Sequence, residues 1–372
     1  MSKLCVQISG SFPPKTCGIG DYTSHLVRRM RAAGADVEVW TRALSPGGEA
    51  ASPGGEHGRG LVAQWDGDNL RLLGRTLRAE RPQVVHLQYE PGVYDSHPAI
   101  LRLPLLARRA GAAFVTTFHS LDGPSAWGRA HRLALLPLLL GSRDITVCSG
   151  RQHHILARIP RLRDRVHLVP IGSNIDPVPA VPFAAALGLR LVYFGFVWRG
   201  RNIELLLRAL AAVRARDPQA TLEIVGGLRD DDYHRALLHL AATLGVASHV
   251  VFSGDLKAPD VSQALHRADI ALLPYATGVS TGRGTLMAAL AHGLPLVTST
   301  VPDNLSLLFQ HGENMMLAPV GDDARFVAHT VVLASDSTLR AHLAAGASRL
   351  APHFDWARIA HQVLALPSYA SA

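Results

Sequence analysis

The sequence predicts an α/β fold made of two successive domains, each with a parallel sheet. The chain has 372 residues, whereas a single core usually stops growing at about 250–300 residues. Apolar runs of strand length alternate with helical patterns along most of the chain, as they do in βαβ units. Between residues 172 and 182 this alternation is broken by proline, asparagine and aspartate, and we interpret this stretch as the linker.

The first predicted domain begins with a strand–helix–strand unit. Its first helix is expected over 21–33, with Leu26 and Met30 on the apolar face. Asp21 is placed to cap the start of this helix and Gly34 to end it. Strands are predicted at 4–9, 36–41, 84–88, 114–118, 145–148 and 166–170.

Three other segments of this domain have distinctive compositions. Residues 45–60 are rich in glycine, proline and serine, so we expect a mobile surface loop without regular structure. The segments 99–110 and 126–140 are leucine-rich with interspersed arginine and histidine, and we expect helices there.

The second predicted domain repeats the same alternation. Its first helix is expected over 202–215, with an apolar stripe. Strands are predicted at 191–194, 222–225, 250–252, 270–274 and 296–298. A last helix near 356–366 follows this sheet and has no obvious place within it.

Composition narrows the partners of the protein. The formal charge is +8, with 37 Lys and Arg residues, nearly all of them arginine. This balance favours an anionic partner such as a nucleotide diphosphate, an acidic membrane surface or nucleic acid. The Ala, Gly, Pro and Arg usage of a GC-rich genome would produce the same balance. We find no basic stretch interleaved with aromatic residues, so nucleic acid is the least favoured of these partners.

Cysteine usage and hydropathy predict a cytoplasmic location. The three cysteines show no metal-ligand spacing, and a reducing compartment is the simplest interpretation. The longest apolar run, 133–140, is interrupted by Pro137 and is too short to cross a bilayer. The first residues lack a signal-peptide pattern. Contact with the inner face of the membrane remains an alternative, because 97–110 and 126–142 are basic and rich in leucine.

Loops that follow strands carry the candidate chemistry, because ligands of open α/β sheets bind outside the carboxyl ends of strands. Gly18 and Gly20 are expected just before a helix, where free amides and the helix dipole favour an anion. The alternative is a tight turn only. NAD is disfavoured, because the third glycine of the dinucleotide fingerprint is absent and no acidic residue ends the second strand.

Two loops of the second domain suit a diphosphate. The first, 196–202, places Arg199 and Arg201 on either side of a glycine beside a helix start. A solvated arginine pair is the alternative. The second, 275–285, combines three glycines with several hydroxyl side chains and Arg283, as phosphate-binding loops do.

Polar residues also end two strands of the first domain. His119 follows the strand at 114–118. His86, Gln88 and Glu90 alternate along the preceding strand and are therefore expected to share one side. This trio suits a hydroxylated substrate, although a hydrogen-bonded core position is an equally good interpretation of each member.

The order of these segments resembles the GT-B glycosyltransferases, and specifically family 4. The resemblance is carried by SFPPKTCGIGDYT, VVHLQYEPG, VTTFHS, VPIGSNI, YFGFVWRGRNIELLLRAL, LEIVGG, FSGDL, ADIALLPY and AALAHGLPLVTS. The closing FDWARIAHQVL resembles the C-terminal helix of that family, which returns to the first domain. The match extends over nearly the whole chain and keeps its order.

The resemblance implies two Rossmann-like domains facing a central cleft. Residues 1–173, completed by 355–372, would form the acceptor side, and 174–354 would bind the donor. The implied reaction is retaining transfer of a sugar from a UDP or GDP sugar to a hydroxyl of a natural product, glycan or lipid-linked glycan. It implies no metal and no cofactor besides this co-substrate.

The resemblance also assigns site residues. Arg201 matches the basic residue before the helix, with Arg199 as its companion, although the usual arginine after the strand glycine is Phe196 here. His119 matches a histidine that reaches the donor sugar and phosphate. The other donor-side positions are Gly18, Gly20, Gly254, Leu256, Ser280, Gly282, Arg283, Gly284 and Thr285, and the acceptor-side positions are Asp21, Gln88 and Glu90.

One departure concerns the donor sugar. Family members commonly carry two glutamates eight residues apart, and the matching positions here are Ser280 and Ala288. The identity of the sugar therefore cannot be assigned from the resemblance. Two alternatives stay open: a non-catalytic subunit that binds a nucleotide sugar, and a nucleotide-sugar epimerase of the same fold.

Overall fold

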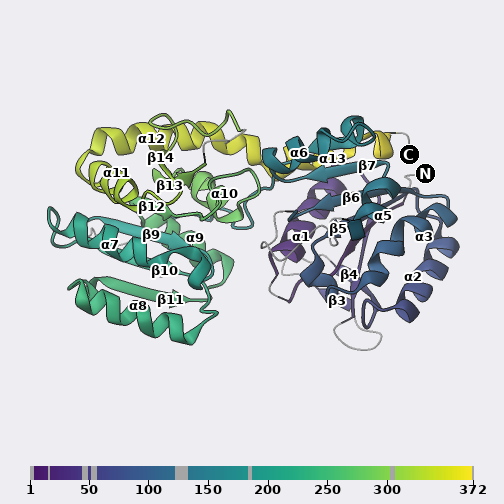
Figure 1. Ribbon diagram of the computed structural model, residues 1–372, viewed down its shortest axis with the longest axis horizontal. Coiled ribbons are helices and arrows are strands. Elements are labelled where there is room, and N and C mark those ends of the chain that lie inside the picture. Colours follow the sequence, from purple (N-terminus) through teal and green to yellow (C-terminus); the bar gives the residue numbers. More distant parts are fainter. Residues whose placement is uncertain are drawn as a thin grey trace. The chain divides into compact units, whose positions relative to one another are not determined.

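The chain divides into two compact units (Figure 1). The computed structural model describes residues 4–15, 17–43, 49–51, 57–121, 133–182, 187–301 and 306–370. The first unit comprises Met1–Gly172 together with Asp355–Ala372, and the second comprises Ser173–Phe354. The boundary predicted from the sequence was at residue 173.

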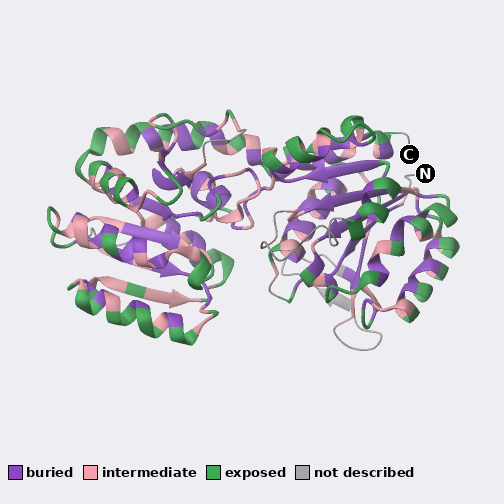
Figure 2. Ribbon diagram, in the orientation of Figure 1, coloured by how far each residue is buried: buried purple, intermediate pink, exposed green. Residues whose placement is uncertain are grey.

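The first unit contains a sheet in the order β3-β4-β2-β1-β5-β6-β7-β8. All neighbouring strands are parallel except β3, which is antiparallel to β4. The strands are β1 (Cys5–Ser9), β2 (Val37–Arg42), β3 (Glu49–Ala51), β4 (His57–Val62), β5 (Val84–Tyr89), β6 (Ala113–Phe118), β7 (Asp144–Val147) and β8 (Val166–Leu168). The six strands predicted in this domain are confirmed, and they read as apolar runs because most of their residues are buried (Figure 2).

The prediction of an unstructured loop over 45–60 was wrong for the part that the structure describes. Strands β3 and β4 lie there, and β4 pairs with β2 through Trp40 opposite Arg59 and Thr41 opposite Gly60. The glycine-rich composition fits this position, because a Cβ on Gly58 would lie 2.9 Å from the Phe12 ring. Residues 44–48 and 52–56 lie outside the described residues.

The helices of the first unit follow its strands. They are α1 (Gly18–Ala32), α2 (Gly67–Glu80), α3 (Leu103–Arg109), α5 (Leu136–Gly141) and α6 (Gly150–Ala157). Gly34 ends α1 as predicted, with a φ of 88° and its N–H on the carbonyl of Arg31. Of the segment 126–140, residues 126–132 lie outside the described part.

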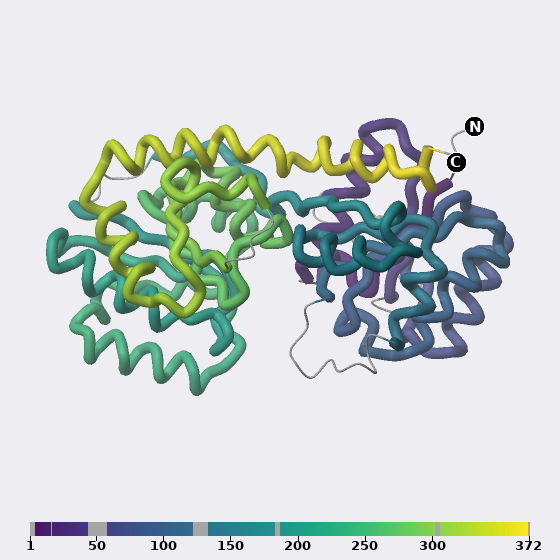
Figure 3. The backbone as a smooth tube through the Cα atoms, turned by 45° about the horizontal axis from the view of Figure 1, so that its top comes forward, coloured from purple at the N-terminus to yellow at the C-terminus, as the bar shows by residue number. Residues whose placement is uncertain are grey.

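The last helices of the chain belong to the first unit, which gives the closing segment its place. Helices α13 (Trp356–Leu364) and α14 (Pro367–Ala370) follow the second unit in sequence, and α13 packs against α1 (Figure 3). Trp356, Ile359 and Val363 share one buried cluster with Leu26 and Met30. The amphipathic pattern of α13 is thus explained by a contact with the beginning of the chain.

The second unit contains a parallel sheet in the order β11-β10-β9-β12-β13-β14. The strands are β9 (Arg190–Phe194), β10 (Thr221–Val225), β11 (Val250–Gly254), β12 (Ile270–Leu273), β13 (Leu296–Thr300) and β14 (Met316–Pro319). The helices are α7 (Ile203–Arg214), α8 (Asp231–Thr243), α9 (Ala258–Arg267), α10 (Gly284–Ala291), α11 (Asp323–Ser335) and α12 (Ser337–Leu350). The five predicted strands are confirmed, whereas β14 was not predicted.

Across the described residues, the helices are too short or too polar to cross a membrane.

Candidate functional site

The order of strands in the second unit reverses between β9 and β12. Strands β10 and β11 extend the sheet on one side of β9, and β12, β13 and β14 extend it on the other. A crevice opens outside the carboxyl ends of the strands at such a reversal, and this is where open α/β sheets bind ligands. The loops that follow β9 and β12 are the two loops predicted from the sequence to bind a diphosphate.

Two arginines from these loops converge on Tyr275, just after β12. The guanidinium carbon of Arg283 lies 4.8 Å from the centre of the Tyr275 ring. Burial raises the pKa of Tyr275 to about 12, and the nearby positive charges of Arg283 and Arg201 act in the opposite direction. The Nε atom of Arg201 is buried and has no hydrogen-bond partner among the residues that the structure describes. The guanidinium carbon of Arg201 lies 5.8 Å from the centre of the Trp198 ring, so the β9 and β12 loops each bring one arginine to the crevice.

Helix α10 begins at the same place. Arg283 is its N-cap residue and makes no capping bond with its side chain. Thr285, in the first turn, shares a hydrogen bond of 2.7 Å with the hydroxyl of Tyr275. The loop before the helix is held in place by the N–H of Val279, which donates to the carbonyl of Ser299 at 2.7 Å. The helix dipole and the two arginines thus favour an anion at one point.

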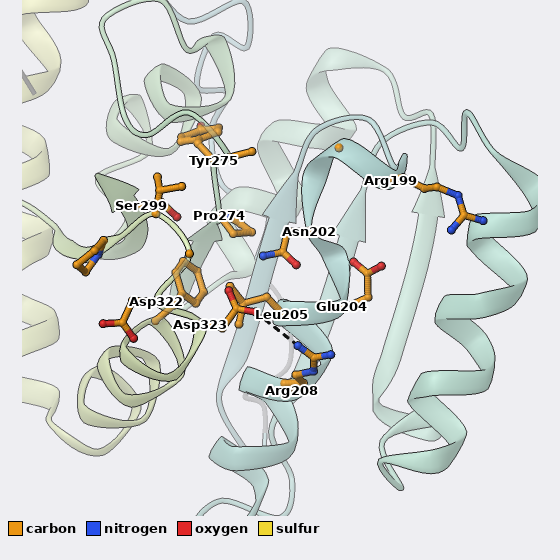
Figure 4. A pocket seen from close by; sticks show the side chains of 16 residues that line it. Arg199, Asn202, Glu204, Leu205, Arg208, Pro274, Tyr275, Ser299, Asp322 and Asp323 are labelled. Atoms are coloured by element: carbon orange, nitrogen blue, oxygen red, sulfur yellow. Dashed lines mark ion pairs between the residues drawn. The ribbon is translucent and has the colours of Figure 1, made fainter. Parts of the chain in front are cut away.

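Arg199 does not join this pair. Its Nε lies 3.2 Å from Asp230, and its guanidinium carbon lies 5.4 Å from the centre of the Tyr233 ring. Figure 4 shows its side chain pointing away from Tyr275. The prediction of Arg199 as a companion of Arg201 missed this ion pair, because Asp230 is far along the chain.

A cavity of about 490 Å³ opens beside the crevice, on the side of α7 and α11, and Arg199 lines it, whereas Arg201 and Arg283 do not (Figure 4). Four strand ends line it: Asn202 follows β9, Tyr275 follows β12, Ser299 lies in β13, and the stretch after β14 supplies Gly321. An ion pair of 3.5 Å between Arg208 and Asp323 borders it. Its volume falls in the range of small-molecule sites, about 300–1,000 Å³.

A further arginine that packs against the β9 loop was missed by the sequence analysis. Arg229, which follows β10, has its guanidinium carbon 4.2 Å above the ring of Phe196, at the position where the family usually carries arginine. Neighbouring backbone segments pair at Val197 and Leu228 and bring these residues together. The signal available in the sequence was a basic residue in the glycine-containing loop after the predicted strand 222–225.

In the first unit, His119 follows β6 and is enclosed by three side chains. Its Nε2 lies 2.9 Å from Oε1 of Gln88, and its Nδ1 lies 4.0 Å from Sγ of Cys148. The Tyr22 ring meets it edge to face, with 4.7 Å between the ring centres. Burial lowers the pKa of His119 to about 3, so the imidazole is neutral near pH 7.

Comparison with known proteins identifies the family. Residues 17–172 match the model of the glycosyl transferase 4-like domain, and residues 188–336 match the model of glycosyl transferases group 1. The chain is a GT-B glycosyltransferase of family 4.

Relatives and solved structures agree with this assignment. A D-inositol 3-phosphate glycosyltransferase of Frankia alni is 29% identical over 93% of both chains. A phosphatidyl-myo-inositol mannosyltransferase of Mycobacterium leprae is 26% identical over 93% of this chain and 91% of the relative. Among solved structures, a sucrose-phosphate synthase of Thermosynechococcus elongatus superposes on this chain with a TM-score of 0.78 and 20% sequence identity. Anabaena HepE in complex with UDP and glucose superposes with a TM-score of 0.75 and 15% sequence identity. Both superpositions cover the full length of both chains.

The glycine loop of this glycosyltransferase differs from the prediction. Gly18 and Gly20 lie inside the first turn of α1, not before it, and the cap position belongs to Cys17. Asp21 accordingly does not cap the helix. The backbone explains Gly20, because a Cβ there would lie 3.0 Å from the carbonyl oxygen of Ser11. A Cβ on Gly18 would meet no atom within 4 Å among the described residues.

Two of the residues predicted on the acceptor side, Gln88 and Glu90, lie in different surroundings in the glycosyltransferase. Gln88 is fully buried and lies between His119 and Gln7. Glu90 leaves the predicted trio, because β5 ends before it and its Oε2 accepts the N–H of Val93 at 3.2 Å. A cap at the following turn satisfies this carboxylate locally.

The remaining donor-side positions lie at different places in the second unit. Gly254 ends β11 at a φ of 67° with open space around it, whereas Leu256 lines a second cavity with Glu223 and Arg267. Ser280 is half-buried in the loop before α10, near Gly282. Ala288 is fully buried inside α10.

Within the described ranges, no cluster of three or more acidic, histidine or cysteine side chains is arranged to hold a metal ion.

Burial also raises the pKa of Asp21, to about 6 from 3.8. The folded protein therefore keeps this proton up to about pH 6, while the unfolded chain releases it near pH 3.8. The contribution of Asp21 to the free energy of unfolding therefore falls as pH rises from about 3.8 to about 6 and is constant above this range. We expect Asp21→Asn to be more stable than wild type at about pH 8 and equal to it at about pH 4, in chemical denaturation. Asp164→Asn, at an exposed position, is the control, and an equal gain there would contradict the assignment to Asp21.

Proposed function

We propose that this glycosyltransferase moves a sugar, with retention of configuration, from a nucleotide-diphosphate sugar to a hydroxyl acceptor. The observation that carries the proposal is the placement of Arg283 at the start of α10 and of Arg201 in the neighbouring β9 loop, both at the carboxyl edge of the second sheet. A departing nucleotide diphosphate carries negative charge that such groups stabilise. UDP bound to HepE, which shares the fold, supports a uridine or guanosine diphosphate as the leaving group.

The chemistry needs no side-chain nucleophile. The acceptor oxygen forms a bond to the anomeric carbon on the face from which the diphosphate oxygen departs, so the configuration is kept. The acceptor proton passes to the departing phosphate oxygen. Arg201 and Arg283 offset the charge that develops there, and neither a metal nor another cofactor enters this scheme.

First-unit residues are assigned supporting and acceptor-side roles. Asp21 is assigned to the acceptor hydroxyl, since a pKa of about 6 allows it to accept a hydrogen bond as a carboxylate near neutral pH. Gln88 is too deeply buried to meet an acceptor and is assigned to His119 instead. The names of the inositol-directed relatives support a polyhydroxylated acceptor, free or lipid-linked. Exposed Leu136 and Leu140 on α5 are compatible with a membrane surface, and both membrane contact and a cytoplasmic location stay predictions.

A panel of nucleotides and nucleotide sugars tests the proposal. A nucleotide at 100 times its Kd should raise the unfolding free energy by about 2.7 kcal/mol, which appears as a thermal shift. Incubation of the best donor with inositol phosphates and other polyols, followed by NMR of the product, reports the anomeric configuration. Inverted product would overturn the retaining mechanism. Binding without transfer would favour the non-catalytic subunit, and interconversion of the donor without an acceptor would favour the epimerase.

A further inference from the structure

We propose that Tyr369, in the last helix of the chain, positions His119 by fixing which of its ring nitrogens carries the proton. The proposal rests on the proposed glycosyl transfer, and for the role of His119 on the donor-sugar contact that the resemblance to family 4 implies. The way in which Tyr369 acts on His119 is a chain of buried hydrogen-bonded side chains, which we call the buried polar chain. Its members are Tyr369, Gln7, Gln88 and His119.

Three hydrogen bonds of equal length connect the buried polar chain. Nε2 of Gln7 donates to the hydroxyl of Tyr369 at 2.9 Å. Nε2 of Gln88 donates to Oε1 of Gln7, also at 2.9 Å. Oε1 of Gln88 lies 2.9 Å from Nε2 of His119. Gln7 and Gln88 are fully buried, so water does not replace these partners.

In the buried polar chain, the preceding residue determines which end of each glutamine amide, the oxygen or the nitrogen, faces the next residue. Gln7 turns its oxygen to Gln88 because its nitrogen is taken by Tyr369. Gln88 then turns its nitrogen to Gln7 and its oxygen to His119. An amide oxygen only accepts hydrogen bonds, so Nε2 of His119 has to be the protonated nitrogen and Nδ1 keeps a lone pair.

The hydroxyl of Tyr369 is itself oriented by His86. Nδ1 of His86 lies 2.7 Å from this hydroxyl, and Nε2 of His86 lies 2.7 Å from Oγ1 of Thr117. Nε2 of Gln7 also lies 3.3 Å from Nδ1 of His86. The amide nitrogen of Gln7 thus faces both the Tyr369 hydroxyl and Nδ1 of His86, so we assign Nδ1 as an acceptor, with Tyr369 donating to it and accepting from Gln7. Phenylalanine at 369 would remove the shorter of the two contacts of the Gln7 amide and leave the longer one, so this amide would be held less firmly in its direction.

Packing of the C-terminal helices fixes the ends of this arrangement. The side chain and N–H of Ser368 both donate to Asp144, which anchors α14. The Trp356 ring lies 5.1 Å from Tyr22, and Tyr22 in turn packs edge to face on His119. A Cβ on Gly172 would lie 2.6 Å from the Trp356 ring, so glycine is required where the chain passes it.

The consequence for the site concerns the kind of contact that His119 makes. A neutral imidazole protonated on Nε2 offers Nδ1 as an acceptor, which suits a sugar hydroxyl and not a phosphate oxygen. The thiol of Cys148, 4.0 Å from Nδ1, is only a weak donor and does not compete with a hydroxyl. His119 is thereby assigned to the sugar, while the arginines of the second unit bind the diphosphate.

Nitrogen-15 NMR of the histidine rings tests the tautomer directly in the full chain. Wild type should show His119, assigned by its loss in His119→Gln, protonated on Nε2 only. Tyr369→Phe should give a mixture of tautomers, and so should Gln88→Met, which removes the acceptor itself. Tyr89→Phe is the matched control, because Tyr89 lies on the same strand as Gln88 but points to the opposite face. It should leave His119 unchanged.

Activity separates this proposal from the proposed function. Tyr369→Phe should lower kcat by about 10- to 100-fold, by analogy with the loss of partners that orient metal-bound histidines, with little change in KM for the donor. An unchanged tautomer in a folded Tyr369→Phe protein would overturn the proposal. A changed tautomer with unchanged transfer would leave the positioning by Tyr369 intact and overturn the role of His119 at the donor.

Discussion

Arg201→Ala is expected to lower kcat/KM for sugar transfer by about 10²- to 10³-fold, the usual loss when one preorganised donor to a developing anion is removed. The Nε atom of Arg201 is buried without a partner in the described part of the chain, and its charge reaches both Tyr193 and Tyr275. Its guanidinium carbon lies 5.8 Å from the centre of the Trp198 ring, and the unpartnered Nε leaves a donor for an incoming anion. Its contribution should therefore be largest in the transition state, where the diphosphate gains charge.

Two further variants serve as comparisons for Arg201→Ala. Arg201→Lys keeps the charge but loses the planar fork, so an intermediate loss is expected. Arg216→Ala removes an exposed arginine that bonds Ser335 away from the crevice, and wild-type activity is expected. Initial rates over a range of donor concentrations give kcat and KM separately. Wild-type kcat/KM in Arg201→Ala would contradict the assignment of this residue to the diphosphate.

The positions of most strands were predictable from local pattern, whereas their order in the two sheets was not predicted. A strand buried on both faces reads as an apolar run, and every strand predicted in either unit is present. Strand β4 was not predictable in this way, because its glycines are explained by its neighbours, with Gly58 under the Phe12 ring. The start of α1 was also misjudged, since no side chain caps it.

The site was predictable to the level of loops and less well to the level of contacts. Arg201 and Arg283 were selected as candidates because both lie in loops that follow strands, and the strand order makes those two loops neighbours. The ion pair of Arg199 with Asp230 and the bond from the N–H of Val93 to Glu90 were not predicted, because these partners cannot be read from local sequence, and Arg199 still lines the cavity. Arg229 and Tyr369 were missed, since each acts through a residue distant in sequence.

Gly226→Ala is expected to destabilise the second unit by about 2–5 kcal/mol, the largest effect that we expect from a single methyl group. Gly226 lies directly after β10 at a φ of 141°, a region nearly restricted to glycine. A Cβ there would lie 2.1 Å from the carbonyl oxygen of Gly195, so the loops after β9 and β10 would have to separate. The β9 loop carries Arg201, and donor affinity should fall along with stability.

Gly245→Ala separates the two causes of this loss. Gly245 also has a positive φ, 67°, but a Cβ at this position would have no neighbouring atom within 4 Å. It should therefore show the conformational penalty alone, roughly 1–2 kcal/mol. Chemical denaturation followed by circular dichroism compares the two variants with wild type. If Gly226→Ala cost no more than Gly245→Ala, the backbone at Gly195 would be free to move, and the close approach of the two loops would not be what holds Arg201 at the crevice.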